Sequence, residues 1–240
     1  MTGKPQSGPS FEIKPFGEEG WIAVFSPCRD DVSAALFANA VAKRLRKETS
    51  IPDGLTDAVA GIDSVTLRFN PVMISAAKAR TILAGAIDAT PFEQPPCDTK
   101  PIVIPVCYGG EHGPDFDSLC AYLGLTPQQL IEAHAARTYR VLTLGFAPGF
   151  AYLGPLDPVL VAPRLDTPRQ HVEAGAVGVA GPFTGVYPLA SPGGWRIIGR
   201  TPACLFDPKA SSPFLFEPGA EVRFVAADPS EFLSYQKAAP

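Results

Sequence analysis

The sequence lacks the patterns that identify several large classes of protein. No window approaches the roughly 20 apolar residues that cross a bilayer, and residues 1–10 have no apolar core of the kind found in secretion signals. Basic residues form no cluster beyond Lys43–Lys47, and the net charge is −4, so the sequence does not predict nucleic-acid binding. We therefore expect a cytoplasmic protein that binds neither membrane nor nucleic acid, with flexible ends at 1–10 and 229–240.

Motifs for metal and nucleotide chemistry are also missing. The five cysteines are scattered without a CxxC pair and the three histidines are far apart, so we expect reduced thiols and no metal site. The sequence contains no P-loop, no GxGxxG that opens a helix and no GxSxG. Neither an ATP site nor a serine nucleophile is therefore evident in this chain.

Residues 11–95 show the order strand, helix, strand, strand, helix, which predicts a small ferredoxin-like α+β domain. Pro95-Pro96 marks its end, because two prolines fit neither a helix interior nor a central strand. The expected elements are a strand at Trp21–Phe25, a helix to about Lys47, strands at Leu55–Ala60 and Ser64–Phe69, and a helix capped by Ser75.

Residues 100–228 alternate short apolar runs with glycine and proline, which predicts a closed, irregular β-barrel. Pro105 favours an edge position for the first strand. The expected strands are Ile102–Val106, Arg140–Leu144, Val172–Val179, Gly185–Leu189, Trp195–Gly199 and Glu221–Val225, with helices at Asp117–Leu123 and from a capping box at Thr126 and Gln129.

Several sequence blocks in this second region occur in a fixed order. They are GG-x-x-GPD at Gly109–Asp115, LGF-x-PGFAYLG at Leu144–Gly154, PR-x-x-TPR at Pro163–Arg169, and TGVYPL followed by SPGGWRIIGRT within Thr184–Thr201. These blocks resemble the B-type subunit of the bacterial ATP-dependent 5-oxoprolinase. The same family includes a sporulation-kinase inhibitor, allophanate hydrolase subunit 1, and subdomains C and D of the urea carboxylase carboxyltransferase.

The resemblance implies a cyclophilin-like barrel and a role in hydrolysing 5-oxo-L-proline to L-glutamate. It also implies partner subunits of the A and C types, and ATP with Mg²⁺ at the level of the complex. Alternatives remain open: an inhibitor that docks on a histidine kinase, a biotin-dependent carboxyltransferase component acting on urea-like amides, or a scaffold without catalysis.

Arginines are the main candidates for substrate contacts, because a guanidinium binds a carboxylate through two parallel hydrogen bonds. We expect Arg164 and Arg169 to act in catalysis and Arg200 to bind an anion; pairing of the first two with Asp166 is the alternative. His134 is a candidate for proton transfer or orientation, or a hydrogen-bonded core residue.

The remaining candidates line the motif blocks. Gly110 and Asp115 would belong to an anion-binding loop, or to a turn in which Asp115 caps the next helix. Aromatic residues after Leu144 would form the wall of a pocket or fill the barrel core. The expected wall and rim residues are Phe146, Phe150, Tyr152, Gly193, Gly194 and Trp195.

Overall fold

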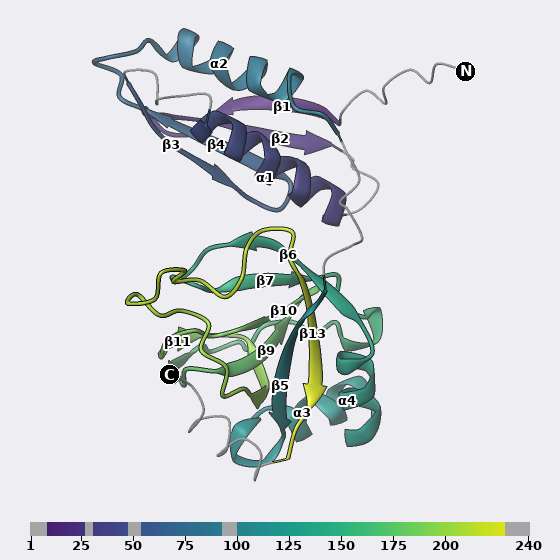
Figure 1. Cartoon of the computed structure of the whole chain (residues 1–240). Helices are drawn as coiled ribbons and strands as arrows, with labels where there is room; N and C mark the ends of the chain where they lie inside the picture. Colours follow the sequence, from purple (N-terminus) through teal and green to yellow (C-terminus); the bar gives the residue numbers. More distant parts are fainter. Residues whose placement is uncertain (1–8, 27–30, 48–53, 93–99, 229–240) are drawn as a thin grey trace. The chain divides into compact units, whose positions relative to one another are not determined.

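The computed structural model describes residues 9–26, 31–47, 54–92 and 100–228 (Figure 1). By its contacts the chain divides into two compact units, Met1–Cys97 and Asp98–Pro240. Residues 1–8 of the expected flexible end at 1–10 lie outside the described residues, as do 229–240 and the Pro95-Pro96 boundary, whereas Ser10 already belongs to a strand.

The first unit is a four-stranded antiparallel sheet with two helices (Figure 1). The predicted order is confirmed from β2 to α2, but an additional edge strand, β1, precedes it and pairs with β2. The sequence does not predict this strand, because only Phe11 and Ile13 carry its apolar alternation. The elements are β1 (Ser10–Pro15), β2 (Gly20–Ser26), α1 (Asp31–Lys47), β3 (Leu55–Ala60), β4 (Ser64–Phe69) and α2 (Ala76–Asp88), with sheet order β1-β2-β4-β3.

One core holds this unit together. Alternate residues on β4, namely Val65, Leu67 and Phe69, are buried with the apolar faces of α1 and α2. The two helices also contact each other, so they share one side of the sheet. Ser75 caps α2 as predicted, its Oγ accepting the Lys78 N–H at 3.3 Å.

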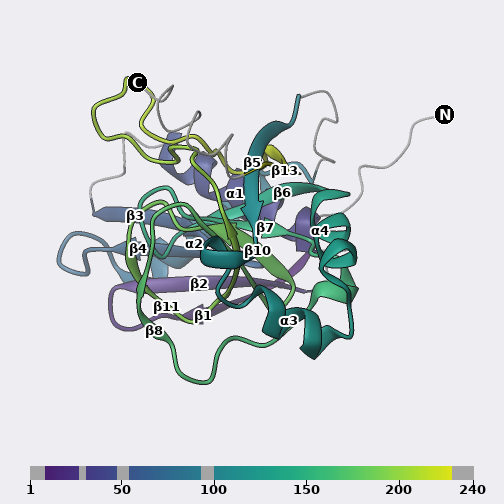
Figure 2. The same cartoon turned by 90° about the horizontal axis from the view of Figure 1, so that it is seen from below.

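The second unit is a closed barrel with strand order β10-β7-β6-β13-β5-β12-β9, and a separate ribbon of β8 and β11 (Figures 1 and 2). The predicted class, a small α+β domain followed by a cyclophilin-like barrel, is confirmed. The elements are β5 (Ile102–Tyr108), η1 (Gly110–His112), α3 (Phe116–Leu123), α4 (Pro127–Ala135), β6 (Thr138–Leu144), β7 (Ala151–Gly154), η2 (Pro158–Leu160), β8 (Arg169–Val172), β9 (Ala176–Ala180), β10 (Phe183–Val186), β11 (Ser191–Gly193), β12 (Arg196–Arg200) and β13 (Glu221–Ala226).

Two strand predictions for the barrel were wrong. The strand β5 is not at an edge, since β13 and β12 flank it. Pro105 is tolerated because β12 pairs with β5 only at Cys107 and Tyr108, beyond the proline. The single strand expected at Val172–Val179 is split into β8 and β9, because the chain turns at Gly175, whose φ is +82°.

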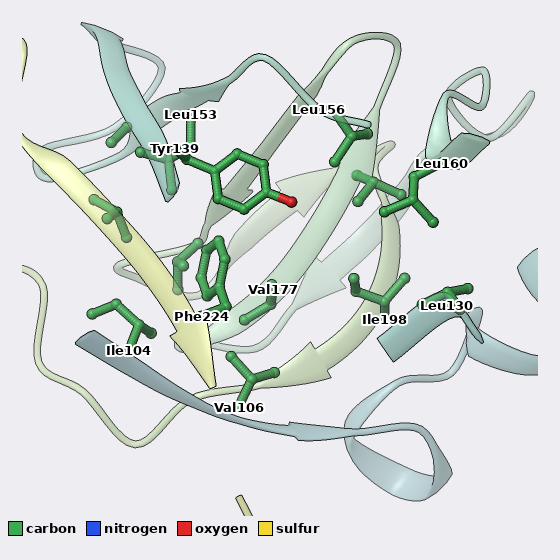
Figure 3. Close-up of a cluster of buried hydrophobic side chains, with 14 of the residues drawn as sticks. Ile104, Val106, Leu130, Tyr139, Leu153, Leu156, Leu160, Val177, Ile198 and Phe224 are labelled. Atoms are coloured by element: carbon green, nitrogen blue, oxygen red, sulfur yellow. The ribbon is translucent and has the colours of Figure 1, made fainter. Parts of the chain in front are cut away.

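The barrel interior is filled by side chains from nearly every strand (Figure 3). Ile104 of β5 lies beside Phe224 of the neighbouring strand β13, and Leu130 of α4 lies near Ile198 of β12. Helices α3 and α4 lie side by side against this barrel (Figures 1 and 2). The predicted capping box at Thr126 and Gln129 is present and starts α4.

Candidate functional site

His134 lies on the buried face of α4 and is completely enclosed by the barrel. Its ring stacks on Phe224, with centroids 4.6 Å apart. Nδ1 lies 2.7 Å from the Tyr108 hydroxyl and Nε2 lies 2.9 Å from Thr184 Oγ1. Burial lowers the pKa of His134 from 6.5 to about 3, so the ring is neutral near pH 7.

The direction of each hydrogen bond around His134 follows from where the Thr184 hydroxyl proton goes. Thr184 donates its hydroxyl proton to the Gly178 carbonyl at 3.0 Å, so its oxygen accepts from the Nε2–H of His134. Nδ1 must then accept from the Tyr108 hydroxyl. We call Tyr108, His134, Thr184 and Gly178 the His134 chain. Every donor in the His134 chain has an acceptor. The arrangement therefore supports His134 as a hydrogen-bonded core residue rather than as a residue that transfers protons.

Asp115 and Arg169 join two motif blocks that are 54 residues apart in sequence. The guanidinium donates in parallel to both carboxylate oxygens, at 2.7 and 2.6 Å, and the Ile197 N–H donates to the same carboxylate at 2.7 Å. Asp115 is buried and Arg169 is half-buried. Arg169 therefore pairs with Asp115 rather than Asp166, and Asp115 makes no side-chain cap to α3.

The glycine-rich loop before α3 packs against β12. Two of its backbone N–H groups donate hydrogen bonds within the chain. Gly109 N–H donates to the Ile198 carbonyl at 3.0 Å, and Gly113 N–H donates to the Gly109 carbonyl at 2.9 Å. Gly110 has a φ of +54° and opens η1. This arrangement supports a structural turn, and it does not direct these amides at an anion.

The PR-x-x-TPR block runs beside the SPGGW turn. Arg169 is paired with Gly193 in the ribbon of β8 and β11, and the Leu165 N–H donates to the Gly194 carbonyl at 2.8 Å. A Cβ on Gly194 would make ordinary contact, 3.6 Å from Pro168. The structure thus brings Arg164, Arg169 and the predicted glycine rim into one region.

Aromatic side chains gather next to this region around Phe150. Its ring lies edge-on to Tyr152, Tyr187 and Trp195, with centroid distances of 5.1, 5.3 and 5.4 Å. Phe150 and Trp195 are buried, which fits the expectation that this block fills a core. Phe146 differs, because 62% of its surface is exposed.

Phe146 also has an unusual backbone. Its φ is +71°, and among the described residues it is the one non-glycine with positive φ. Its ring lies edge-on to Phe150 at 5.4 Å and to Tyr187 at 6.1 Å. A bulky residue in this region of φ is strained by about 1–3 kcal/mol. Strained backbone conformations of this kind are found most often at functional sites.

Tyr187 was missed by the sequence analysis. Its side chain is buried, the Trp195 backbone N–H binds its hydroxyl oxygen, and Arg164 and Arg169 are close enough to act on it electrostatically. Burial raises the pKa of Tyr187 above 10, and the amide and both arginines partly oppose this. The signal available in the sequence was its place in TGVYPL, immediately before the glycine turn.

The other predicted arginines differ in how far they are engaged. Arg200 donates to the Ala174 carbonyl at 2.9 Å and lies 3.9 Å from Glu173. Arg164 is exposed, and within the described part of the chain no hydrogen bond or ion pair occupies its guanidinium.

Ser191 Oγ is buried and has no hydrogen-bond partner in the described residues. We call Arg164, Phe146, Tyr187 and Ser191 the open group of this site.

Taken together, the barrel presents a guanidinium, a buried phenol and an exposed aromatic ring within one cluster of motifs. A guanidinium suits a carboxylate, and an aromatic face suits a flat apolar body.

Within residues 9–26, 31–47, 54–92 and 100–228, no group of three or more metal-binding side chains occurs. In the same residues, no helix is long and apolar enough to cross a membrane. The fold defines a two-unit α+β protein whose second unit is a cyclophilin-like barrel that carries this candidate site.

Comparison with known proteins narrows this class. Residues 11–216 match the family described as the carboxyltransferase domain, subdomain C and D, and the chain belongs to this family. Proteins named as the B-type subunit of 5-oxoprolinase match it at 52% identity over 128 residues in Escherichia coli O157:H7 and 44% over 136 residues in Bacillus subtilis. These matches cover 53% and 57% of this chain and 59% and 57% of the relatives, so the chain spans under two thirds of their length.

Solved structures agree with the fold. The crystal structure of TTHA0988 is 36% identical with a TM-score of 0.72, covering 87% of this chain and 40% of that one. A conserved uncharacterized protein from Pyrococcus horikoshii, PH0987, is 38% identical with a TM-score of 0.55, covering 92% of this chain and all of that one. The Kluyveromyces lactis urea amidolyase, at 19% identity and a TM-score of 0.77, covers 96% of this chain and 16% of that one and shares the fold.

Proposed function

We propose that this chain is the B-type subunit of an ATP-dependent 5-oxoprolinase that hydrolyses 5-oxo-L-proline to L-glutamate. The observation that carries the proposal is the 44–52% identity to proteins of that name from separate bacteria. The site chemistry is compatible with it, because 5-oxoproline is a small planar lactam with one carboxylate. Opening the lactam breaks its C–N bond and develops charge on the carbonyl oxygen, which aligned donors would stabilise.

The proposed activity requires partner subunits of the A and C types, and the isolated chain would be inactive. This chain covers only 40% of TTHA0988, which carries further residues on the same chain. ATP and Mg²⁺ would act at the level of the complex. The Gly109, His112 and Gly113 amides of the glycine loop donate within the chain, and the described residues contain no group of three metal-binding side chains.

Co-expression with A-type and C-type partners from the same genome tests this function. We expect a complex that releases glutamate from 5-oxo-L-proline only when all chains and ATP are present. Assembly without glutamate release would contradict the substrate and point to urea-like amides. Failure to assemble would contradict the subunit role and favour the alternative of a kinase inhibitor.

A further inference from the structure

The open group contains features that internal packing leaves unexplained. Phe146 keeps a strained backbone although 62% of the residue is exposed, so burial compensates for little of the strain. Arg164 has no partner in the described part of the chain, whereas Arg169 of the same block is fully engaged by Asp115. Each feature is explained if a ligand completes it.

Tyr187 connects these features in space. Its ring lies 6.1 Å from the ring of Phe146, and its hydroxyl is within electrostatic range of Arg164. The Trp195 N–H occupies the phenol oxygen, and the phenol proton has no acceptor among the described residues. A ligand between Phe146 and Arg164 would therefore meet an aromatic face, a cation and a hydrogen-bond donor.

We propose that Arg164 and Phe146 form the two sides of a site for a small planar carboxylate, with Tyr187 as the hydrogen-bond donor between them. The guanidinium takes the carboxylate through paired hydrogen bonds, and the ring of Phe146 packs on the flat face of the ligand. Within the proposed function, on which this inference rests, that ligand is 5-oxo-L-proline. Arg169 then has a different task, since it holds the ribbon of β8 and β11 in place through Asp115.

The backbone of Phe146 allows a test that separates ligand contact from packing. Glycine adopts φ near +70° without strain, so Phe146→Gly should raise the melting temperature while weakening ligand binding. Phe16 is the matched control, because it is also exposed, at 55%, but is not among the positive-φ residues. Phe16→Gly should lower the melting temperature slightly and leave binding unchanged.

Binding of two probes to the co-purified complex measures each side of the site. 5-Oxo-L-proline carries the carboxylate and 2-pyrrolidinone lacks it. We expect Arg164→Gln to weaken 5-oxo-L-proline about tenfold or more and leave 2-pyrrolidinone unchanged. Phe146→Gly should weaken both probes by a similar factor, about three- to tenfold. Arg223→Gln, at an exposed barrel arginine outside the motif blocks, is the control for charge.

The outcomes distinguish this site from the proposed function. Glutamate release that survives in both variants, with affinities unchanged, would overturn the site and leave the function standing. Probe binding that shows the expected pattern in a complex without turnover would support the site and overturn the function. A Phe146→Gly variant that loses stability would also overturn the site, because it would show that the ring serves packing.

Discussion

Two groups of buried hydroxyls in the barrel differ in how completely their hydrogen bonds are met. In the His134 chain, each proton has an acceptor, from Tyr108 through His134 and Thr184 to a backbone carbonyl. In the open group, Ser191 Oγ has no partner in the described residues. A conspicuous histidine can therefore be structural, while another buried hydroxyl in the same unit is left without a hydrogen-bond partner among the described residues.

The largest expected effect comes from removing Asp115, the carboxylate that pairs with Arg169. Asp115→Ala would leave the Arg169 guanidinium and the Ile197 N–H without their carboxylate, and we expect a loss of about 3 kcal/mol in the free energy of unfolding. Urea denaturation measures it. Glu19→Ala, which breaks an exposed pair with Arg68 at 3.6 Å, is the control and should cost at most about 0.5 kcal/mol. Equal effects would show that Asp115 is not a structural anchor.

The next effect depends on pH and tests the closure of the His134 chain. Unfolded His134 binds a proton below pH 6.5, whereas the folded state does so only near pH 3. The unfolded state therefore holds more protons between these values, and the free energy of unfolding falls by about 1.4 kcal/mol per pH unit as the pH drops below 6.5. Between pH 6 and 4.5, His134→Gln should lack this slope. Parallel profiles for the two proteins would mean that His134 is protonated in the folded state.

Adjacent glycines give a smaller, local test at the edge of the open group. Neither Gly193 nor Gly194 has a positive φ, so alanine is allowed by the backbone at both. A Cβ at Gly193 would overlap the buried Tyr187 hydroxyl, and we expect Gly193→Ala to cost about 1–3 kcal/mol. Gly194→Ala should change stability by less than about 0.5 kcal/mol, because its Cβ has room. Thermal melting of the two variants measures this difference. Equal losses of stability would show that the Tyr187 side chain shifts easily to make room for a Cβ.

The smallest expected effect has the opposite sign. Ser191→Ala removes a buried hydroxyl that has no partner in the described chain, so stability should stay the same or rise by up to about 1 kcal/mol. Thr126→Ala removes a hydroxyl that caps α4 and should cost about 1 kcal/mol. A loss at Ser191 comparable to that at Thr126 would show that Ser191 does have an internal partner.

Local sequence patterns predicted much of the fold because helix caps and strand alternation depend on residues that are close in sequence. The capping residues Ser75 and Thr126 start helices where expected, and the alternation in β4 gives its strand and its buried face. Short strands such as β7 and the ribbon of β8 and β11 were not predicted, since three or four residues carry too little periodicity. The edge strand β1 was missed for a related reason, because only alternate residues are half-buried.

The site was less predictable because its geometry depends on long-range pairing. Arg164 and Arg169 share one motif, and nothing near them in sequence indicates that Asp115 engages the second and not the first. The isolation of His134 inside the barrel depends on Tyr108 and Thr184, from strands on either side of it in sequence. Tyr187 stands in the TGVYPL block, but its contact with Gly193 depends on the fold and cannot be read from the sequence.

The pairing of β5 with β13 has a consequence for synthesis of the chain. These are the first and last described strands of the barrel, and they run parallel, with Ile102 opposite Val222 and Val106 opposite Ala226. On the ribosome, β5 and β6 therefore emerge long before the strand that lies between them. Until residue 226 leaves the exit tunnel, both present unpaired edges that other nascent chains can join, so translation pauses after β12 would favour aggregation.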